Sequence, residues 1–108
     1  MTIMQGDSYP IYIELVQDGK RLTPEMVADV EVCVGNKLRK LYTEDEVFFE
    51  DSTNRWYIYP TQEETMELPV DEHTVIARIR YKNVGKDEVV GVNLGKIKVT
   101  DSISEEAI

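Results

Sequence analysis

The stretch that decides the fold reads RWYIYPTQEETMELPVDEHTVIARIRY and covers residues 55–81. It opens with an aromatic run of the kind enriched in β-strands, and it ends in strict apolar–polar alternation, which predicts a half-buried strand. Between these runs, Thr61 and Glu64 have the spacing of a helix-capping box, and Pro69 limits that helix to about two turns. The predicted order is a strand, a short helical crossing from one sheet to another, and a second strand.

Similar patterns elsewhere predict further strands. Pro10 lacks an N–H, so its strand is expected at a sheet edge. Thr23 followed by Pro24 predicts the start of a one-turn helix. The apolar parity of the last strand slips at Gly95, and a β-bulge there would turn both apolar sets toward the core. A hairpin turn is expected at residues 84–87. The predicted strands cover residues 9–16, 30–34, 38–42, 47–50, 55–59, 75–81 and 90–99.

These patterns predict an all-β fold, an antiparallel β-sandwich of about seven to eight strands with one or two single-turn helices. Each alternating strand has one apolar face to bury, and a second sheet is the natural cover. The chain has 108 residues, which is close to the commonest domain size. We therefore expect one sandwich domain over residues 1–100, followed by a weakly periodic tail over residues 101–108.

Composition excludes several classes of partner. Asp and Glu number 21 against 12 Lys and Arg, for a formal charge of −9, which argues against binding to nucleic acid or to anionic membranes.

Cys33 has no second cysteine to pair with, so an internal disulfide is excluded. The first residues lack the basic and apolar regions of a signal peptide, and no apolar run is long enough to insert in a bilayer. We expect a soluble protein in a cytoplasm-like compartment.

Catalytic and metal-binding candidates are few. His73 is the only histidine and falls in a charged segment expected to be a loop. Cys33 lies between two valines, where a small packed side chain is expected rather than a nucleophile. The carboxylates of residues 44–46, Glu50 and Asp51 lack the spacing of a calcium loop. These features predict no enzyme activity and no cofactor.

Two groups of side chains are candidates for a binding surface. Parity places Trp56 in the core and Tyr57 and Tyr59 outward. With Tyr12, these two tyrosines form either a platform on which sugars stack or ordinary cross-strand neighbours. Exposed tyrosines are also common in protein interfaces. The second group is a basic stripe on one sheet face. It is either a solvated face with carboxylates interleaved or a docking surface for an acidic partner, another copy included. The stripe consists of Arg78, Arg80, Lys82, Lys96 and Lys98.

Four segments together resemble one family. They are QGDSYP at residues 5–10, LTPEMV at 22–27, PTQEET at 60–65 with Leu68-Pro69, and VTDS at 99–102. The pattern is similar to the Ig-like N-terminal domain of baseplate upper proteins from tailed phages of Gram-positive bacteria, and to small proteins of that type encoded in Firmicutes prophages.

The resemblance implies an immunoglobulin-like fold and a virion component without catalysis or cofactor. Such a component assembles in the host bacterial cytoplasm and attaches receptor-binding proteins to the tail. The expected partners are other tail or baseplate proteins, with a homo-oligomer as an open alternative. A carbohydrate-binding β-sandwich module that uses the exposed tyrosines is the alternative function.

Overall fold

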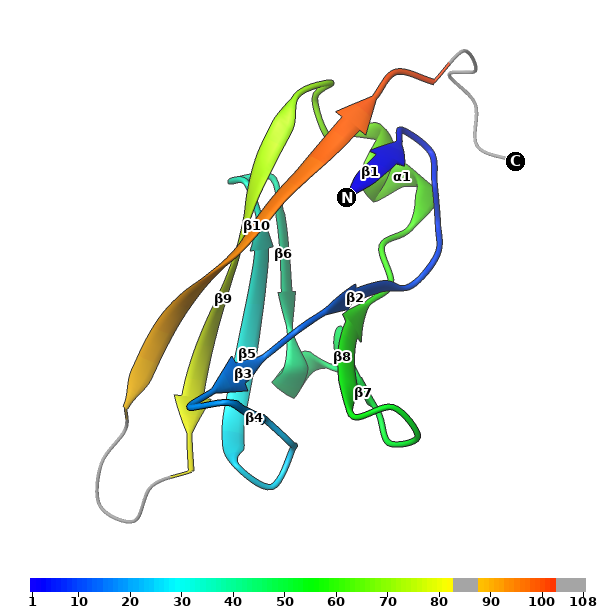
Figure 1. Cartoon of the computed structure of the whole chain (residues 1–108). Helices are drawn as coiled ribbons and strands as arrows, with labels where there is room; N and C mark the ends of the chain where they lie inside the picture. The colour runs from blue at the N-terminus through cyan, green and yellow to red at the C-terminus, as the bar shows by residue number, and fades with distance from the viewer. Residues whose placement is uncertain (83–87, 103–108) are drawn as a thin grey trace.

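The computed structural model describes residues 1–82 and 88–102, and these residues form mainly β-strands (Figure 1). The elements in chain order are β1 (Thr2–Met4), β2 (Ile11–Ile13), β3 (Val16–Gln17), β4 (Lys20–Arg21), β5 (Val27–Val34), β6 (Leu38–Leu41), the 3-10 helix η1 (Tyr42–Glu44), β7 (Val47–Glu50), β8 (Arg55–Ile58), α1 (Gln62–Met66), β9 (Glu72–Tyr81) and β10 (Val89–Thr100). The strands form a five-stranded sheet in the order β1-β10-β9-β5-β6, a three-stranded sheet in the order β2-β8-β7, and the β3-β4 hairpin. The all-β class is confirmed.

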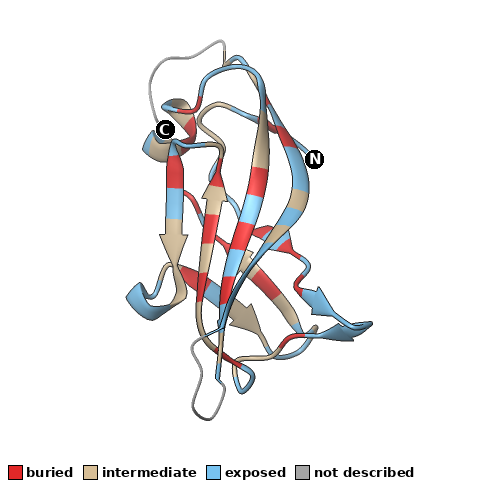
Figure 2. Ribbon diagram, turned by 90° about the vertical axis from the view of Figure 1, so that its left-hand side faces the viewer, coloured by how far each residue is buried: buried red, intermediate tan, exposed pale blue. Residues whose placement is uncertain are grey.

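The five-stranded sheet is built around β9, which pairs antiparallel with β5 on one side and with β10 on the other. Its residues alternate as predicted: Val75, Ala77 and Ile79 are buried, while Arg78 and Arg80 are exposed. Successive side chains of a strand point to opposite faces of the sheet, so every second residue of β9 reaches the core. Figure 2 shows this banding along the strand.

The predicted bulge in β10 is confirmed, but its effect on burial is only partly as expected. The register with β9 shifts between Asn93 and Gly95, and Gly95 has φ 103, a conformation that favours glycine. Ile97 and Val99 beyond the bulge are buried. Val90 before the bulge is 40% exposed, because this end of β10 extends past the three-stranded sheet that would cover it (Figure 1).

The predicted crossing between sheets is confirmed. Helix α1 joins β8 of the three-stranded sheet to β9 of the five-stranded sheet. Its capping box is complete: the Thr61 hydroxyl accepts from the Glu64 N–H at 3.1 Å, and the Glu64 carboxylate accepts from the Thr61 N–H at 2.9 Å. The local sequence therefore sets both the start of the helix and the point at which the chain changes sheets.

The N-terminal segment corrects the expectation of a fully antiparallel fold. Strand β1 pairs parallel with β10, so the larger sheet is mixed. The segment that follows β1 is held by the buried Thr65 of α1, whose hydroxyl accepts from the Gly6 N–H at 3.0 Å and donates to the Asp7 carbonyl at 2.8 Å. The Gln5 amide also donates to the Leu68 carbonyl at 2.8 Å. These contacts with the crossing helix position β1 beside β10.

The strand count and one helix also differ from expectation. The described residues contain ten strands rather than seven or eight, partly because residues 9–16 divide into β2 and β3, and β3 pairs with β4 across the Asp18-Gly19 turn. The expected helix near Thr23 is only a turn, closed by a bond from the Met26 N–H to the Thr23 carbonyl at 3.0 Å. Strand β5 begins at once at Val27, which leaves no room for a helix.

Both sheets contribute to one hydrophobic core (Figure 2). Trp56 of β8 is 1% exposed, and its indole N–H donates to the Leu22 carbonyl at 2.9 Å. The rings of Tyr42 and Phe49 pack edge-on against it, with centroids 5.2 and 5.1 Å away. The expectation that Trp56 is a core residue is confirmed. The predicted turn at residues 84–87 and most of the predicted tail, residues 103–108, lie outside the described residues.

Candidate functional site

The outer face of the three-stranded sheet carries a row of aromatic rings, one from each strand. Tyr12 of β2 lies opposite Tyr57 of β8, and Phe48 of β7 lies opposite Tyr57 on the other side. The ring centroids are 5.5 Å apart for Tyr12 and Tyr57 and 5.3 Å apart for Phe48 and Tyr57. Sequence reasoning missed Phe48, because only the β7–β8 register shows that its exposed side lies beside Tyr57.

Polar neighbours hold the Tyr12 end of this row. The Arg55 guanidinium lies 3.9 Å from the centre of the Tyr12 ring, a cation–π contact. The Tyr12 hydroxyl donates to the Glu50 carboxylate at 2.6 Å, and the Thr53 hydroxyl donates to the same carboxylate at 2.8 Å. The bond from Tyr12 lowers the pKa of Glu50, aided by Thr53, and it also raises the pKa of Tyr12. Arg55 thus occupies one face of the Tyr12 ring.

Tyr59 lies apart from the row. It follows β8, is 49% exposed, and borders a shallow hollow with Ser8, Gln62 and Glu63 at the start of α1. Among the described residues, it makes no ring contact with Tyr12 or Tyr57. The structure therefore brings Tyr12 and Tyr57 together and leaves Tyr59 as a separate exposed ring.

The predicted basic residues Arg78, Arg80, Lys82, Lys96 and Lys98 are all exposed. In the strand register, Glu31 stands opposite Arg78, Asp29 opposite Arg80 and Glu72 opposite Lys98. The Lys96 ammonium also lies 3.9 Å from the Glu72 carboxylate. Carboxylates thus interleave with the cations on this face, which is the geometry of the solvated interpretation, and exposed pairs of this kind contribute little to stability.

His73 occupies a strand rather than the expected loop. β9 begins at Glu72, because residues 72–74 continue its ladder with β10 past the bulge. The imidazole Nε2 lies 2.7 Å from the Pro69 carbonyl oxygen, which requires a proton on that nitrogen. The imidazole also lies close to Gly35. A Cβ atom at that position, as in alanine, would lie only 3.1 Å from the imidazole Nδ1. These contacts give His73 a structural role at the start of β9.

Cys33 differs from the packed residue that was expected. Val32 and Val34 are buried on the core face of β5, so alternation places Cys33 on the outer face, where it is half-buried. Burial raises the pKa of its thiol, and the nearby Glu31 carboxylate raises it further. A raised pKa lowers the thiolate fraction at neutral pH, which makes this thiol a poor nucleophile.

The acidic segment after β6 does not converge on a single point. Glu44 and Asp45 are exposed, while Glu46 lies 3.8 Å from the Lys40 ammonium and Glu50 is engaged by Tyr12. Across residues 1–82 and 88–102, no three His, Cys, Asp or Glu side chains gather as metal ligands would.

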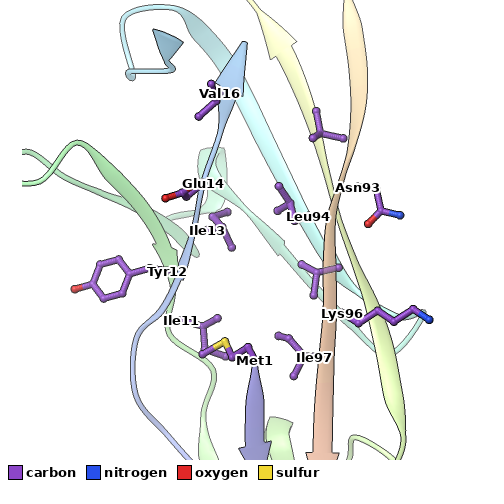
Figure 3. Close-up of a pocket in the computed structure, with 12 residues that line it drawn as sticks. Met1, Ile11, Tyr12, Ile13, Glu14, Val16, Asn93, Leu94, Lys96 and Ile97 are labelled. Carbon is purple, nitrogen blue, oxygen red and sulfur yellow. The ribbon is translucent and has the colours of Figure 1, made fainter. Parts of the chain in front are cut away.

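A groove of about 520 Å³ lies between β2 and the part of β10 that precedes its pairing with β1 (Figure 3). Ile11 and Ile13 line it from the β2 side, and Leu94 and Ile97 line it from β10. Met1 lies between the two walls at the end of the groove where β1 begins. Sequence analysis did not find this groove, because its walls come from segments about 80 residues apart.

Comparisons with protein-family models, with curated proteins and with solved structures find no match to this chain. In the part of the chain that the structure describes, the helices are too short to reach across a lipid bilayer.

Proposed function

We propose that the chain is a non-enzymatic tail or baseplate accessory protein of a phage or prophage, with an Ig-like β-sandwich fold, and that it acts through protein–protein contacts. The observation that supports this most is the crossing at residues 60–69. Its capping box and terminal Pro69 are the most distinctive part of the sequence resemblance, and α1 connects the two sheets at that point.

The surface also supports a contact role. The edge of the larger sheet at β10 carries exposed apolar side chains, among them Val89 at 54% and Val90 at 40% exposure. Apolar residues gathered on a sheet edge are a common feature of strand-mediated recognition. The mixed charges around Arg78 and Lys96 would set the orientation of a partner rather than supply most of the affinity.

Incorporation into phage particles tests this proposal. The gene would be given a small C-terminal epitope tag in its host, the prophage induced, and tailed particles purified on a density gradient. The protein is expected to sediment with the particles, at a fixed ratio to a capsid protein, while a tagged cytoplasmic protein stays at the top. A protein absent from the particles, in a host whose deletion strain still produces infectious particles, would refute the proposal.

Carbohydrate binding is the second candidate, favoured by the Tyr12–Tyr57–Phe48 row across one exposed sheet face. Aromatic rings that stack on sugars need an open face, and Arg55 already covers one face of Tyr12, which leaves Tyr57 and Phe48 as the central contacts. A glycan array with the native protein and a Tyr57→Ala variant tests it. Binding by the native protein that is lost in the variant supports carbohydrate binding. An array on which the native protein binds no glycan at millimolar ligand refutes it.

A further inference from the structure

Among residues 1–82 and 88–102, no strand pairs with the outer edge of β10 before Lys98. The Tyr81 N–H donates to the Glu88 carbonyl at 3.1 Å, and antiparallel ladders alternate between bonded and non-bonded residues. The N–H and C=O groups of Val89, Gly91 and Asn93 therefore point away from β9. Within the described residues, only β1 pairs with this edge, and that ladder begins at Thr2 and Lys98.

The groove continues the line of β1 along this free edge. Figure 3 shows Met1 at its end, with Ile11 and Ile13 on one wall and Leu94 and Ile97 on the other, all four turned toward the space between. Because β2 walls the far side, a segment that enters the groove from the end of β1 would run alongside the edge of β10. A strand there would prolong the β1–β10 ladder and place every second side chain on the apolar floor.

The edge of β10 over residues 89–95 lacks the residue types that block strand pairing at other sheet edges. Residues 89–95 contain neither a charged residue nor a proline. The opposite edge of the same sheet, β6, carries Arg39 and Lys40, and β2 is preceded by Pro10. Charges and prolines on edge strands prevent pairing with other chains. The edge over residues 89–95 lacks both and lies beside a groove lined mainly by apolar side chains, with Glu14 and Lys96 among them, so it is suited to pairing.

We propose that this groove binds a single extended strand of a partner protein, which adds to the free edge of β10 in line with β1. The partner strand carries apolar side chains at alternate positions facing Ile13 and Leu94, and polar ones facing solvent. Backbone bonds to Val89, Gly91 and Asn93 supply affinity, and the apolar floor sets the register. That the partner is a tail or baseplate protein rests on the proposed function, but the strand-binding site does not.

A built-in probe strand tests the site without knowledge of the partner. The hexapeptide Val-Thr-Val-Thr-Val-Thr would be placed directly before Met1 of the full chain, where it continues β1 into the groove with its valines on the same face as Met1 and the buried Ile3. We expect the melting temperature to rise by about 4 °C or more, and amide exchange at Gly91 and Asn93, which the six added residues reach in the β1–β10 register, to slow by about tenfold or more. The matched control replaces the three valines with aspartates, which the apolar floor rejects, and it should give neither effect.

The substitution Gly91→Pro tests the same site by weakening the pairing of an added strand with β10. The Gly91 N–H points to the free edge, so proline removes a donor that β9 does not use, and a Cβ at this position meets no atom within 4 Å. The variant should cancel the gain from the probe strand, while Gly91→Ala retains it. If the valine extension changes neither stability nor exchange, the site is refuted. A dimer of the native chain in light scattering that Gly91→Pro alone dissociates would overturn the proposal in favour of a second copy.

The particle assay separates this inference from the proposed function. If the native protein enters particles and Gly91→Pro does not, while Gly91→Ala does, the groove is the tail contact. If both variants enter equally, the groove is not the tail contact and the assignment of its partner as a tail or baseplate protein fails, although the proposed function stands and the probe-strand experiment decides the strand-binding site. If even the native protein is absent from particles, the proposed function fails, and the probe-strand experiment still decides the groove.

Discussion

Replacing Thr65 by valine should destabilise the fold by removing one buried hydroxyl while keeping the shape of the side chain. Thr65 is 1% exposed, and its hydroxyl accepts from the Gly6 N–H at 3.0 Å and donates to the Asp7 carbonyl at 2.8 Å. The variant leaves the Gly6 N–H without its acceptor and the Asp7 carbonyl without this donor. It therefore tests whether α1 holds the segment that follows β1.

The expected cost follows from these contacts. A typical intramolecular hydrogen bond contributes about 1 kcal/mol net, and leaving a buried donor unsatisfied costs about 1–3 kcal/mol. Thr65→Val should therefore lower the free energy of unfolding by about 2–3 kcal/mol. For a domain of this size, this corresponds to a fall of about 8–12 °C in melting temperature. Thr65→Ser keeps the hydroxyl and loses one methyl group, so it should cost only about 1 kcal/mol.

Urea denaturation of the native protein and both variants, followed by Trp56 fluorescence, measures these differences. Hydrogen exchange at the Gly6 amide gives a local readout, and it should accelerate in Thr65→Val beyond the global loss of stability. A Thr65→Val protein as stable as the native one would refute the anchoring role. The same conclusion would follow if Thr65→Ser proved the more damaging change.

Three further predictions concern other buried or half-buried groups. Burial alone would raise the pKa of Glu64, but the Lys40 ammonium at 2.6 Å and the Thr61 N–H lower it overall. The Glu64 carboxylate is therefore protonated at a higher pH in the unfolded chain than in the folded protein. The stability that its ion pair contributes is present above about pH 4.5 and is lost as pH falls through the folded pKa. Lys40→Met should cost about 1.5 kcal/mol at pH 7 and clearly less at pH 3 in urea melts; an equal cost at both would contradict the pairing. Trp56→Phe should cost about 2 kcal/mol, because the Leu22 carbonyl loses its donor and a cavity forms, and a calorimetric loss below about 0.5 kcal/mol would speak against this bond. Cys33 should react with a disulfide reagent at pH 7 more slowly than free cysteine, since its pKa is raised, and a rate equal to that of free cysteine would count against its burial.

Short-range chemistry in the sequence determined the strands and the sheet crossing. The alternation of Val75, Ala77 and Ile79 depends only on the period of a strand, and the capping box of Thr61 and Glu64 depends on residues three apart. The slip at Gly95 likewise appears in the chain itself as a change of parity. Such features form from neighbouring residues, so they can be read without knowing the rest of the fold.

Only the tertiary structure decided which distant segments meet. The parallel pairing of β1 with β10 joins residues more than 90 positions apart. The segment after β1 is bonded by a threonine hydroxyl in α1 that no local pattern distinguishes. The position of Phe48 beside Tyr57 needs the β7–β8 register. The groove needs β2 and β10 to stand on either side of it, with Met1 at one end. Hydrophobic periodicity shows which side of a strand is buried, but the neighbour of each strand edge is set by long-range packing. Among the described residues, that packing leaves the edge of β10 before Lys98 without a neighbouring strand.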